Sequence, residues 1–198
     1  GPLFRAALVR LAPAHHVLLL GCHHMVLDAW SRGILVRDLS ALYRAHAAGE
    51  APALPPLAVQ YADFAVWQRD WLSRGARGAQ LAYWRDALAG APAVLELPVD
   101  RPRRESPTYR GGQVRFAIPE SVATSLEALA QAHGATLFMV LLAGFEVLLH
   151  RLTGARDVVV GTAIANRRAP QLEPLIGFFT NTLVLRTRVE GDPRFCDF

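Results

Sequence analysis

The sequence is short of several residue types, and each shortage narrows what the protein can do. It has no lysine: all 21 basic residues are arginine, which we attribute, with the many alanines, to genomic base composition. The net charge of +4 comes from scattered arginines without a basic stripe or interleaved aromatics, a pattern that argues against nucleic-acid binding. The two cysteines, Cys22 and Cys196, lie far apart, which favours a cytoplasmic chain without disulfides.

Long hydrophobic runs are also absent. The longest, residues 137–149, is interrupted by Glu146 and is too short to span a bilayer, so we expect no membrane partner. No signal peptide is recognisable at the start of the sequence. The chain begins without methionine in a strand-like segment and stops within a predicted helix, so we expect it to be the middle of a longer domain.

What the sequence does have is the composition of a globular protein. Of its 198 residues, 52% are hydrophobic and 19% are charged, which is enough to bury a sizeable core. Residues 90–112 are rich in proline and arginine and are the best linker candidate. Strands and helices are mixed on both sides of this linker, so the sequence predicts an α/β or α+β fold with two lobes.

Before the linker, the pattern predicts a hairpin and three helices. The second strand is a near-continuous apolar run, which predicts a strand covered on both faces. Asp28 is the expected N-cap of an amphipathic helix that Gly49 ends, and a proline-rich connector follows. The expected strands are 4–11 and 16–22, and the two later helices, rich in aromatics, are 61–72 and 80–88.

After the linker, a second group of elements is expected. Pro119 marks the start of an amphipathic helix that ends near His133, and Thr136 caps an apolar helix. Asp192-Pro193 is typical of a helix start. The expected strands are 113–118, 157–163 (a buried run) and 180–189, and the expected helices are 121–132 and 137–152.

The side chains best suited to catalysis are clustered at Cys22-His23-His24, with Asp28 four residues after His24. An imidazole is largely neutral near pH 7, and with a carboxylate fixed nearby it suits proton handling in acyl transfer. The alternative is a histidine at a strand end that only hydrogen-bonds the backbone. We expect no metal site, because adjacent strand residues cannot readily converge on one ion and no second ligand cluster is evident.

Three segments carry a recognisable combination of motifs. Residues 23–31 read His-His-Met-Val-Leu-Asp-Ala-Trp-Ser, residues 61–67 read Tyr-Ala-Asp-Phe-Ala-Val-Trp, and residues 176–182 read Ile-Gly-Phe-Phe-Thr-Asn-Thr. In this order and spacing they resemble signature elements of the condensation domains of nonribosomal peptide synthetases. Thr180 replaces the usual valine and Ala29 the usual glycine. Residues 161–167 resemble a further stretch of that family.

The resemblance covers essentially the whole chain and implies a particular fold. Such domains are similar to chloramphenicol acetyltransferase, with two related lobes and a tunnel between them. The chain would be incomplete at both ends. Residues 1–96 would be the C-terminal part of the first lobe, residues 97–111 the inter-lobe linker, and residues 112–198 the N-terminal part of the second lobe.

The resemblance also implies roles for the first motif. His24 would be catalytic, taking the proton of an attacking amine or orienting the amine by a hydrogen bond. Alternation along an extended segment would point His23 away, so a structural hydrogen bond is expected for it. From the residues alone, Asp28 as an N-cap would accept a hydrogen bond from the backbone N–H of Ser31 or its neighbour. The resemblance implies instead a structural ion pair with an arginine, either Arg167 or an arginine outside this chain.

Ala29 needs no positive φ if it is the first residue of the helix, where its N–H could face a developing oxyanion. The second motif is expected to pack a pair of helices, with Trp67, Trp71 and Trp84 as anchors in the core or at the lobe interface. Asn181 is expected to be a buried hydrogen-bonding residue. The motif or tunnel residues are Trp30, Tyr61, Asp63, Trp67, Gly177, Asn181 and Thr182.

The activity implied is amide-bond formation between a carrier-bound acyl or peptidyl thioester and a carrier-bound aminoacyl acceptor, by an acyltransferase inactive as an isolated fragment. No cofactor is expected to bind directly, because both substrates would arrive on phosphopantetheine arms. The expected partners are donor and acceptor peptidyl carrier domains and an adjacent adenylation domain. The alternatives are an epimerisation domain, a catalytically silent docking module, and an acetyltransferase that uses coenzyme A.

Overall fold

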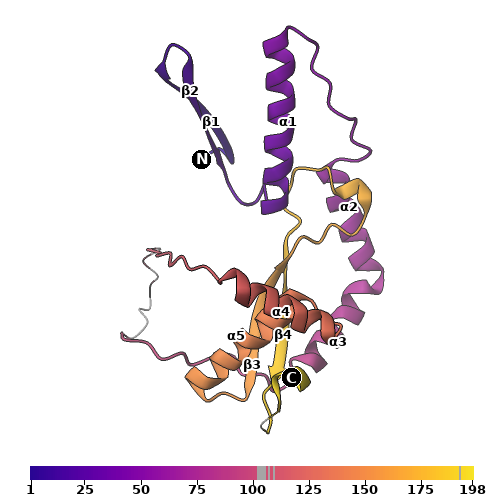
Figure 1. The fold of residues 1–198 in the computed structure, drawn as a ribbon. Helices are drawn as coiled ribbons and strands as arrows, with labels where there is room; N and C mark the ends of the chain where they lie inside the picture. Colours follow the sequence, from indigo (N-terminus) through magenta and orange to yellow (C-terminus); the bar gives the residue numbers. More distant parts are fainter. Residues whose placement is uncertain (102–105, 107, 109, 192) are drawn as a thin grey trace. The chain divides into compact units, whose positions relative to one another are not determined.

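The computed structural model describes residues 1–101, 106, 108, 110–191 and 193–198. Contacts divide the chain into two compact units, whose elements are labelled in Figure 1. Unit 1 comprises Gly1–Arg85 with Thr162–Leu183, and unit 2 comprises Asp86–Gly161 with Val184–Phe198. These contact-based units are not the predicted lobes, because unit 1 includes a segment from beyond the linker. The lobe division at residues 97–111 stays a prediction.

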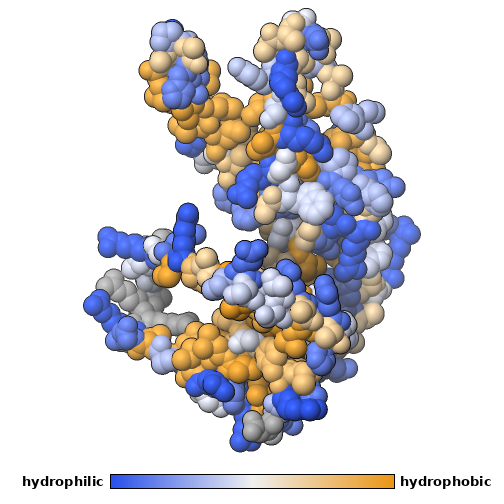
Figure 2. Space-filling view, in the orientation of Figure 1, coloured by the Kyte–Doolittle hydropathy of each residue, from blue (hydrophilic) through white to orange (hydrophobic). Residues whose placement is uncertain are grey.

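Unit 1 begins with the predicted hairpin. Strand β1 (Phe4–Ala12) pairs antiparallel with β2 (His15–Cys22), and the register is irregular between Arg10 and Ala12. The prediction that β2 is covered on both faces is wrong for this chain: its run from Val17 to Leu20 is exposed. The reason is that the hairpin forms a sheet of two strands only among the described residues. Figure 2 accordingly shows hydrophobic surface on the hairpin.

The helix α1 (Ala29–Ala48) follows as predicted. Asp28 is its N-cap with extended backbone, and Gly49 ends it with a left-handed φ of 73° that only glycine adopts without strain. The next two predicted helices are also present. They are α2 (Tyr61–Trp71) and α3 (Arg77–Ala87), and a kink in the short segment η1 (Leu72–Ala76) separates them, because Arg74 and Gly75 leave the helical conformation there.

A small aromatic core holds unit 1 together. Phe64 of α2 packs against residues 172–179, a segment distant in the sequence. Phe64 and Phe179 have ring centroids 4.7 Å apart, and Phe179 is only 2% exposed. The buried members of the cluster are Phe64, Leu172, Leu175 and Phe179. This core therefore fixes the third sequence motif against the second.

Unit 2 contains the predicted helix pair and most of the second sheet. The helices are α4 (Glu120–Ala132) and α5 (Leu137–Thr153), and Thr136 caps α5 by accepting a hydrogen bond from the Met139 N–H. Strand β3 (Asp157–Ile164) pairs with β4 (Asn181–Arg188), within two residues of the predicted bounds. Leu149, Val158 and Val189 form the core of this unit.

Three expectations for the later part of the chain need correction or stay open. The predicted strand at 113–118 is absent: a strand needs a neighbour for its backbone groups, and none of the described strands pairs with it. Asp192 lies outside the described residues, and beyond it only the short 3-10 turn η3 (Phe195–Asp197) forms. Of the predicted linker, residues 102–105, 107 and 109 lie outside the described residues.

Among the described residues, no helix on its own has both the length and the apolar character needed to cross a membrane. Only α4 and α5 taken together meet that test, and they are bent by 106°.

Candidate active site

The carboxylate of Asp28 is the centre of a buried polar network at the start of α1. It is 1% exposed, and its Oδ1 accepts the Ser31 N–H at 2.8 Å, as predicted for an N-cap. Its Oδ2 accepts the Phe179 N–H at 3.1 Å and the Thr180 hydroxyl at 3.5 Å. The Asp28 N–H in turn donates to the Gly177 carbonyl at 3.1 Å. The first and third motifs are thus joined through one side chain.

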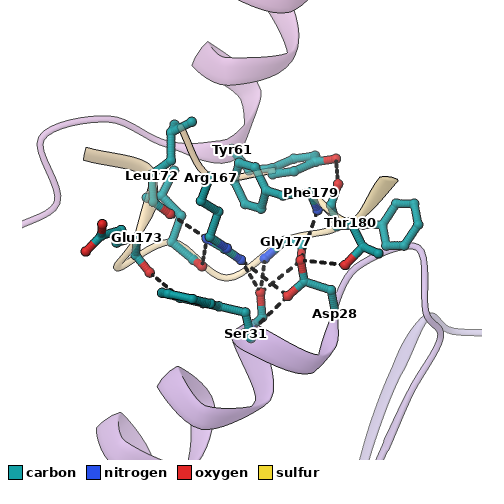
Figure 3. Close-up of polar contacts among 12 residues, drawn as sticks. Asp28, Ser31, Tyr61, Arg167, Leu172, Glu173, Gly177, Phe179 and Thr180 are labelled. Atoms are coloured by element: carbon teal, nitrogen blue, oxygen red, sulfur yellow. Dashed lines mark hydrogen bonds and ion pairs between the residues drawn. The ribbon is translucent and has the colours of Figure 1, made fainter. Parts of the chain in front are cut away.

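Arg167 completes the network as the predicted arginine partner of Asp28. Its Nη2 lies 3.3 Å from Asp28 Oδ1 and donates to the Ser31 hydroxyl at 2.7 Å (Figure 3). Its Nη1 donates to the carbonyls of Leu172 and Leu175, the latter at 2.9 Å. Both side chains of the ion pair are at most 1% exposed. The alternatives left open for Asp28 are therefore both realised: it is an N-cap and an ion-pair partner.

The environment of Asp28 favours its charged form. Burial raises the pKa of the Asp28 carboxyl, but hydrogen bonds from Ser31 and Phe179 and the Arg167 charge outweigh burial and hold this pKa below its usual value. Asp28 is therefore an anion at neutral pH, and all the groups around it are donors. Such a carboxylate does not suit proton transfer; it suits holding a backbone segment in place.

Ser31 is a member of the network for which the sequence predicted no role beyond donating its N–H. Its hydroxyl donates to the Gly177 carbonyl at 2.8 Å and accepts the Gly177 N–H at 3.0 Å, besides the bond from Arg167. One donor and two acceptor positions are thus all used, and the side chain is fully buried. The sequence feature that could have indicated this role is the position of Ser31, three residues after an N-cap aspartate.

Tyr61, from the second motif, contacts the same segment. Its hydroxyl donates to the Phe178 carbonyl at 2.8 Å, and its ring meets the Phe179 ring edge-on at 5.1 Å. The ring also covers Gly177: a methyl group there would overlap Tyr61 Cδ2 and lie 2.7 Å from Cε2. Glycine is required at position 177 by this close approach and not by its backbone angles.

The two histidines differ in their surroundings. His23 follows β2, donates its N–H to Leu3 at 2.7 Å, and accepts the Met25 N–H on Nδ1 at 3.1 Å. His24 lies in the turn that follows, and its side chain is exposed. Its ring meets the Phe178 ring edge-on, with centroids 5.2 Å apart. Within the described part of the chain, neither nitrogen of the His24 ring makes a hydrogen bond.

Other predicted residues take ordinary structural positions. Ala29 is the first residue of α1, so the alanine causes no backbone strain. Trp30 is half exposed, and its indole N–H donates to the Glu173 carbonyl at 3.0 Å. Asp63 accepts the Gln60 N–H at 2.7 Å and caps the start of α2.

Two expectations about burial need correction. Trp67 and Trp71 stack with ring centroids 5.8 Å apart but are 56% and 38% exposed, so they are not core residues of unit 1, and their alternative place at the lobe interface stays a prediction. Asn181 is exposed rather than buried, because it begins β4 and its side chain accepts the N–H of the adjacent Thr182 at 2.9 Å. Thr182 is exposed as well. Neither Asn181 nor Thr182 takes part in the Asp28 network.

Across the described residues, no group of three or more histidine, cysteine, aspartate or glutamate side chains is placed to hold a metal ion.

Comparison with known proteins identifies the family to which the three motifs belong. The family described as “Condensation domain” matches residues 1–198, and the chain belongs to that family. It is 50% identical over 197 residues to phosphinothricin tripeptide synthetase PhsC of Streptomyces viridochromogenes, covering 100% of this chain and 18% of PhsC. It is 49% identical over 193 residues to malpibaldin synthetase of Mortierella alpina, covering 98% of this chain and 4% of that synthetase.

Solved structures give the same mixed α/β, chloramphenicol acetyltransferase-like fold. The X-domain from teicoplanin biosynthesis matches with a TM-score of 0.90 and 33% identity, over 100% of this chain and 45% of the X-domain chain. The first condensation domain of the calcium-dependent antibiotic synthetase matches with a TM-score of 0.74 and 31% identity, over 98% and 43%. The chain therefore spans under half of these solved domains and a small part of the curated synthetases.

Proposed function

We propose that this chain is the catalytic-histidine part of a condensation domain that forms amide bonds in nonribosomal peptide synthesis. The donor is an acyl or peptidyl thioester on one carrier domain, and the acceptor is an aminoacyl group on another. Both arrive on phosphopantetheine arms, so the chain itself binds no cofactor. Supporting this, its relatives include a phosphinothricin tripeptide synthetase, and the fold matches a solved four-domain nonribosomal peptide synthetase.

His24 has the central role in this proposal. The acceptor nitrogen attacks the thioester carbonyl carbon, a C–N bond forms, and the C–S bond breaks. Either His24 takes the proton lost by the nitrogen and passes it to the departing thiolate, or His24 only orients the amine by a hydrogen bond. In both cases the nitrogen loses one proton and the thiolate leaves as a free thiol. An exposed imidazole with both nitrogens free can serve either purpose.

Asp28 and Arg167 are proposed to be structural. Their pair is fully buried, all its polar contacts run to the backbone and to Ser31 and Thr180, and none runs to His24. What they hold is the segment 177–180, whose Phe178 ring lies against His24. The single observation that carries the proposal is this pairing of a rigid buried network with an exposed histidine beside it.

The product identifies the reaction. The full-length protein is supplied with donor and acceptor carriers loaded by its own adenylation domains, and the acceptor carrier is analysed by mass spectrometry and chiral chromatography. The proposal predicts a chain lengthened by one amide bond on the acceptor carrier. An inverted α-carbon without a new amide would instead identify an epimerisation domain.

A second candidate is a silent docking module, favoured by the high structural similarity to an X-domain that has been solved in a complex with OxyB. In that case the loaded carriers would yield neither an amide nor an inverted centre, while a partner protein would bind the domain. The division into lobes, with residues 97–111 between them, belongs to the first proposal and applies to the complete domain.

A further inference from the structure

The segment 177–179 is held from the α1 side by its backbone. Both polar backbone groups of Gly177 bond the Ser31 hydroxyl, and the Phe179 N–H bonds Asp28. The Phe179 ring is buried beneath the Arg167 guanidinium, whose Cζ lies 4.0 Å from the ring centroid. The backbone on each side of Phe178 is therefore fixed by buried contacts.

The same segment is held from the α2 side by Tyr61. The Tyr61 hydroxyl donates to the carbonyl of Phe178 itself, at 2.8 Å. The Tyr61 ring covers Gly177 so closely that no side chain fits between them. A peptide unit held by two helices has little freedom to rotate. The direction of the Phe178 Cα–Cβ bond is therefore fixed as well.

Phe178 differs from its two neighbours because its side chain is not buried in the core. Gly177 and Phe179 are buried, whereas Phe178 is 39% exposed. Its ring meets the His24 ring edge-on, 5.2 Å between centroids at an interplanar angle of 78°, a favourable aromatic geometry. The His24 ring makes no hydrogen bond among the described residues, unlike that of His23. Among the described residues, the Phe178 ring is thus an aromatic contact of a His24 imidazole that makes no hydrogen bond.

We propose that Phe178 is a positioning residue for His24 and that Tyr61 holds Phe178 in place through its hydroxyl. This rests on the proposed catalytic role of His24. The three sequence motifs then have a common purpose: the second motif fixes the third, and the third orients the histidine of the first. Neither Phe178 nor Tyr61 contacts the reacting atoms in this scheme.

The test compares variants of the full-length protein, with the acceptor carrier supplied in trans over a range of concentrations. Phe178→Leu removes the ring edge, and we expect kcat to fall between about 10- and 100-fold with KM for the carrier little changed, because small misplacements of a catalytic group are costly. Tyr61→Phe removes only the hydroxyl, and we expect about a 3- to 10-fold loss of kcat. Phe178→Tyr keeps the edge-on ring and should restore most of the rate.

Matched controls separate positioning from folding. Tyr83→Phe on α3 and Phe116→Leu alter exposed side chains of the same kinds and should leave kcat unchanged. In a His24→Ala background, Phe178→Leu should cause no further loss, because its effect acts through the missing imidazole. A wild-type kcat for both Phe178→Leu and Tyr61→Phe, or an equal loss with and without His24, would overturn the proposal. If His24→Ala itself retained full activity, the proposed function would fail instead.

Discussion

At the scale of single residues, the unusual feature is a charged pair sealed inside unit 1. Removing one partner of such a pair leaves an unpaired buried charge, which costs about 3–5 kcal/mol. Asp28 also accepts hydrogen bonds from two buried backbone N–H groups, those of Ser31 and Phe179. Asp28 therefore holds two distant segments together. Its loss should lower the free energy of unfolding more directly than it affects the reaction.

The first prediction concerns Asp28→Asn. The folded-state pKa of Asp28 is lowered, so its contribution to stability is complete above the unfolded pKa of about 3.9 and is lost as the pH falls through the lower folded pKa. We expect the free energy of unfolding at pH 7 to fall by about 3 kcal/mol or more, and the gap to wild type to narrow below about pH 4. Urea unfolding of the condensation domain at pH 7 and pH 3 measures both. A gap that is independent of pH would contradict this account.

The second prediction concerns Ser31→Ala. The change leaves both Gly177 backbone groups and one Arg167 nitrogen without this partner in a buried site, so we expect about 1–3 kcal/mol of destabilisation or more. Ser40→Ala on the same helix is the matched control, because its hydroxyl bonds only the Val36 carbonyl at an exposed position. Thermal unfolding compares the two variants. Equal, small shifts would show that the Ser31 contacts are not important for stability.

At the scale of elements, the segment after η2 (Pro170–Leu172) depends on close approach to α2. We predict that Gly177→Ala lowers the free energy of unfolding by about 1–3 kcal/mol. The added methyl group overlaps the Tyr61 ring, and the hydrogen bond from the Ser31 hydroxyl keeps the backbone of residue 177 from moving away. Gly144→Ala, in open space on α5, should stabilise by about 0.5–1 kcal/mol. Opposite signs in a denaturation series support the packing described; a neutral Gly177→Ala would contradict it.

A fourth prediction concerns Glu146, a carboxyl buried on the apolar helix α5 and bonded to the Thr187 hydroxyl at 3.1 Å. Burial raises its pKa, and the Thr187 bond only partly offsets this. With a raised folded pKa, its contribution to stability is complete below the unfolded pKa and is lost as the pH rises through the folded one. Glu146→Gln should therefore be more stable than wild type at pH 7 and equal to it near pH 4. A constant difference across this range would contradict the burial argument.

Element boundaries show what local sequence signals can and cannot predict. Asp28, Gly49 and Thr136 marked helix ends correctly, because capping is decided by neighbouring residues. The strand expected at 113–118 failed, because alternation does not supply a partner strand. The exposure of β2 and of Trp67 was missed for a related reason: burial depends on what covers a face, and no local pattern reports that.

At the scale of the whole molecule, the fold class and family followed from three motifs in order. The Asp28–Arg167 pair came from resemblance, with Arg167 one of two possibilities. The roles of Ser31, Tyr61 and Phe178 in joining the motifs could not be predicted, because they rest on the path of residues 166–180. Asn166, with a left-handed φ of 53°, turns that path just before Arg167 enters the network. Nothing in the linear spacing indicates such a turn.

The central claim is that His24 acts on the reacting amine, and one measurement tests it most directly. Single-turnover amide formation is followed in the full-length protein with both carriers loaded, comparing wild type, His24→Ala and the exposed hairpin control His16→Ala. We predict a loss of about 10²–10⁴-fold for His24→Ala, the usual effect of removing a positioned base, with an unchanged rate for His16→Ala and unchanged unfolding for both. Amide formation by His24→Ala at the wild-type rate would contradict the account.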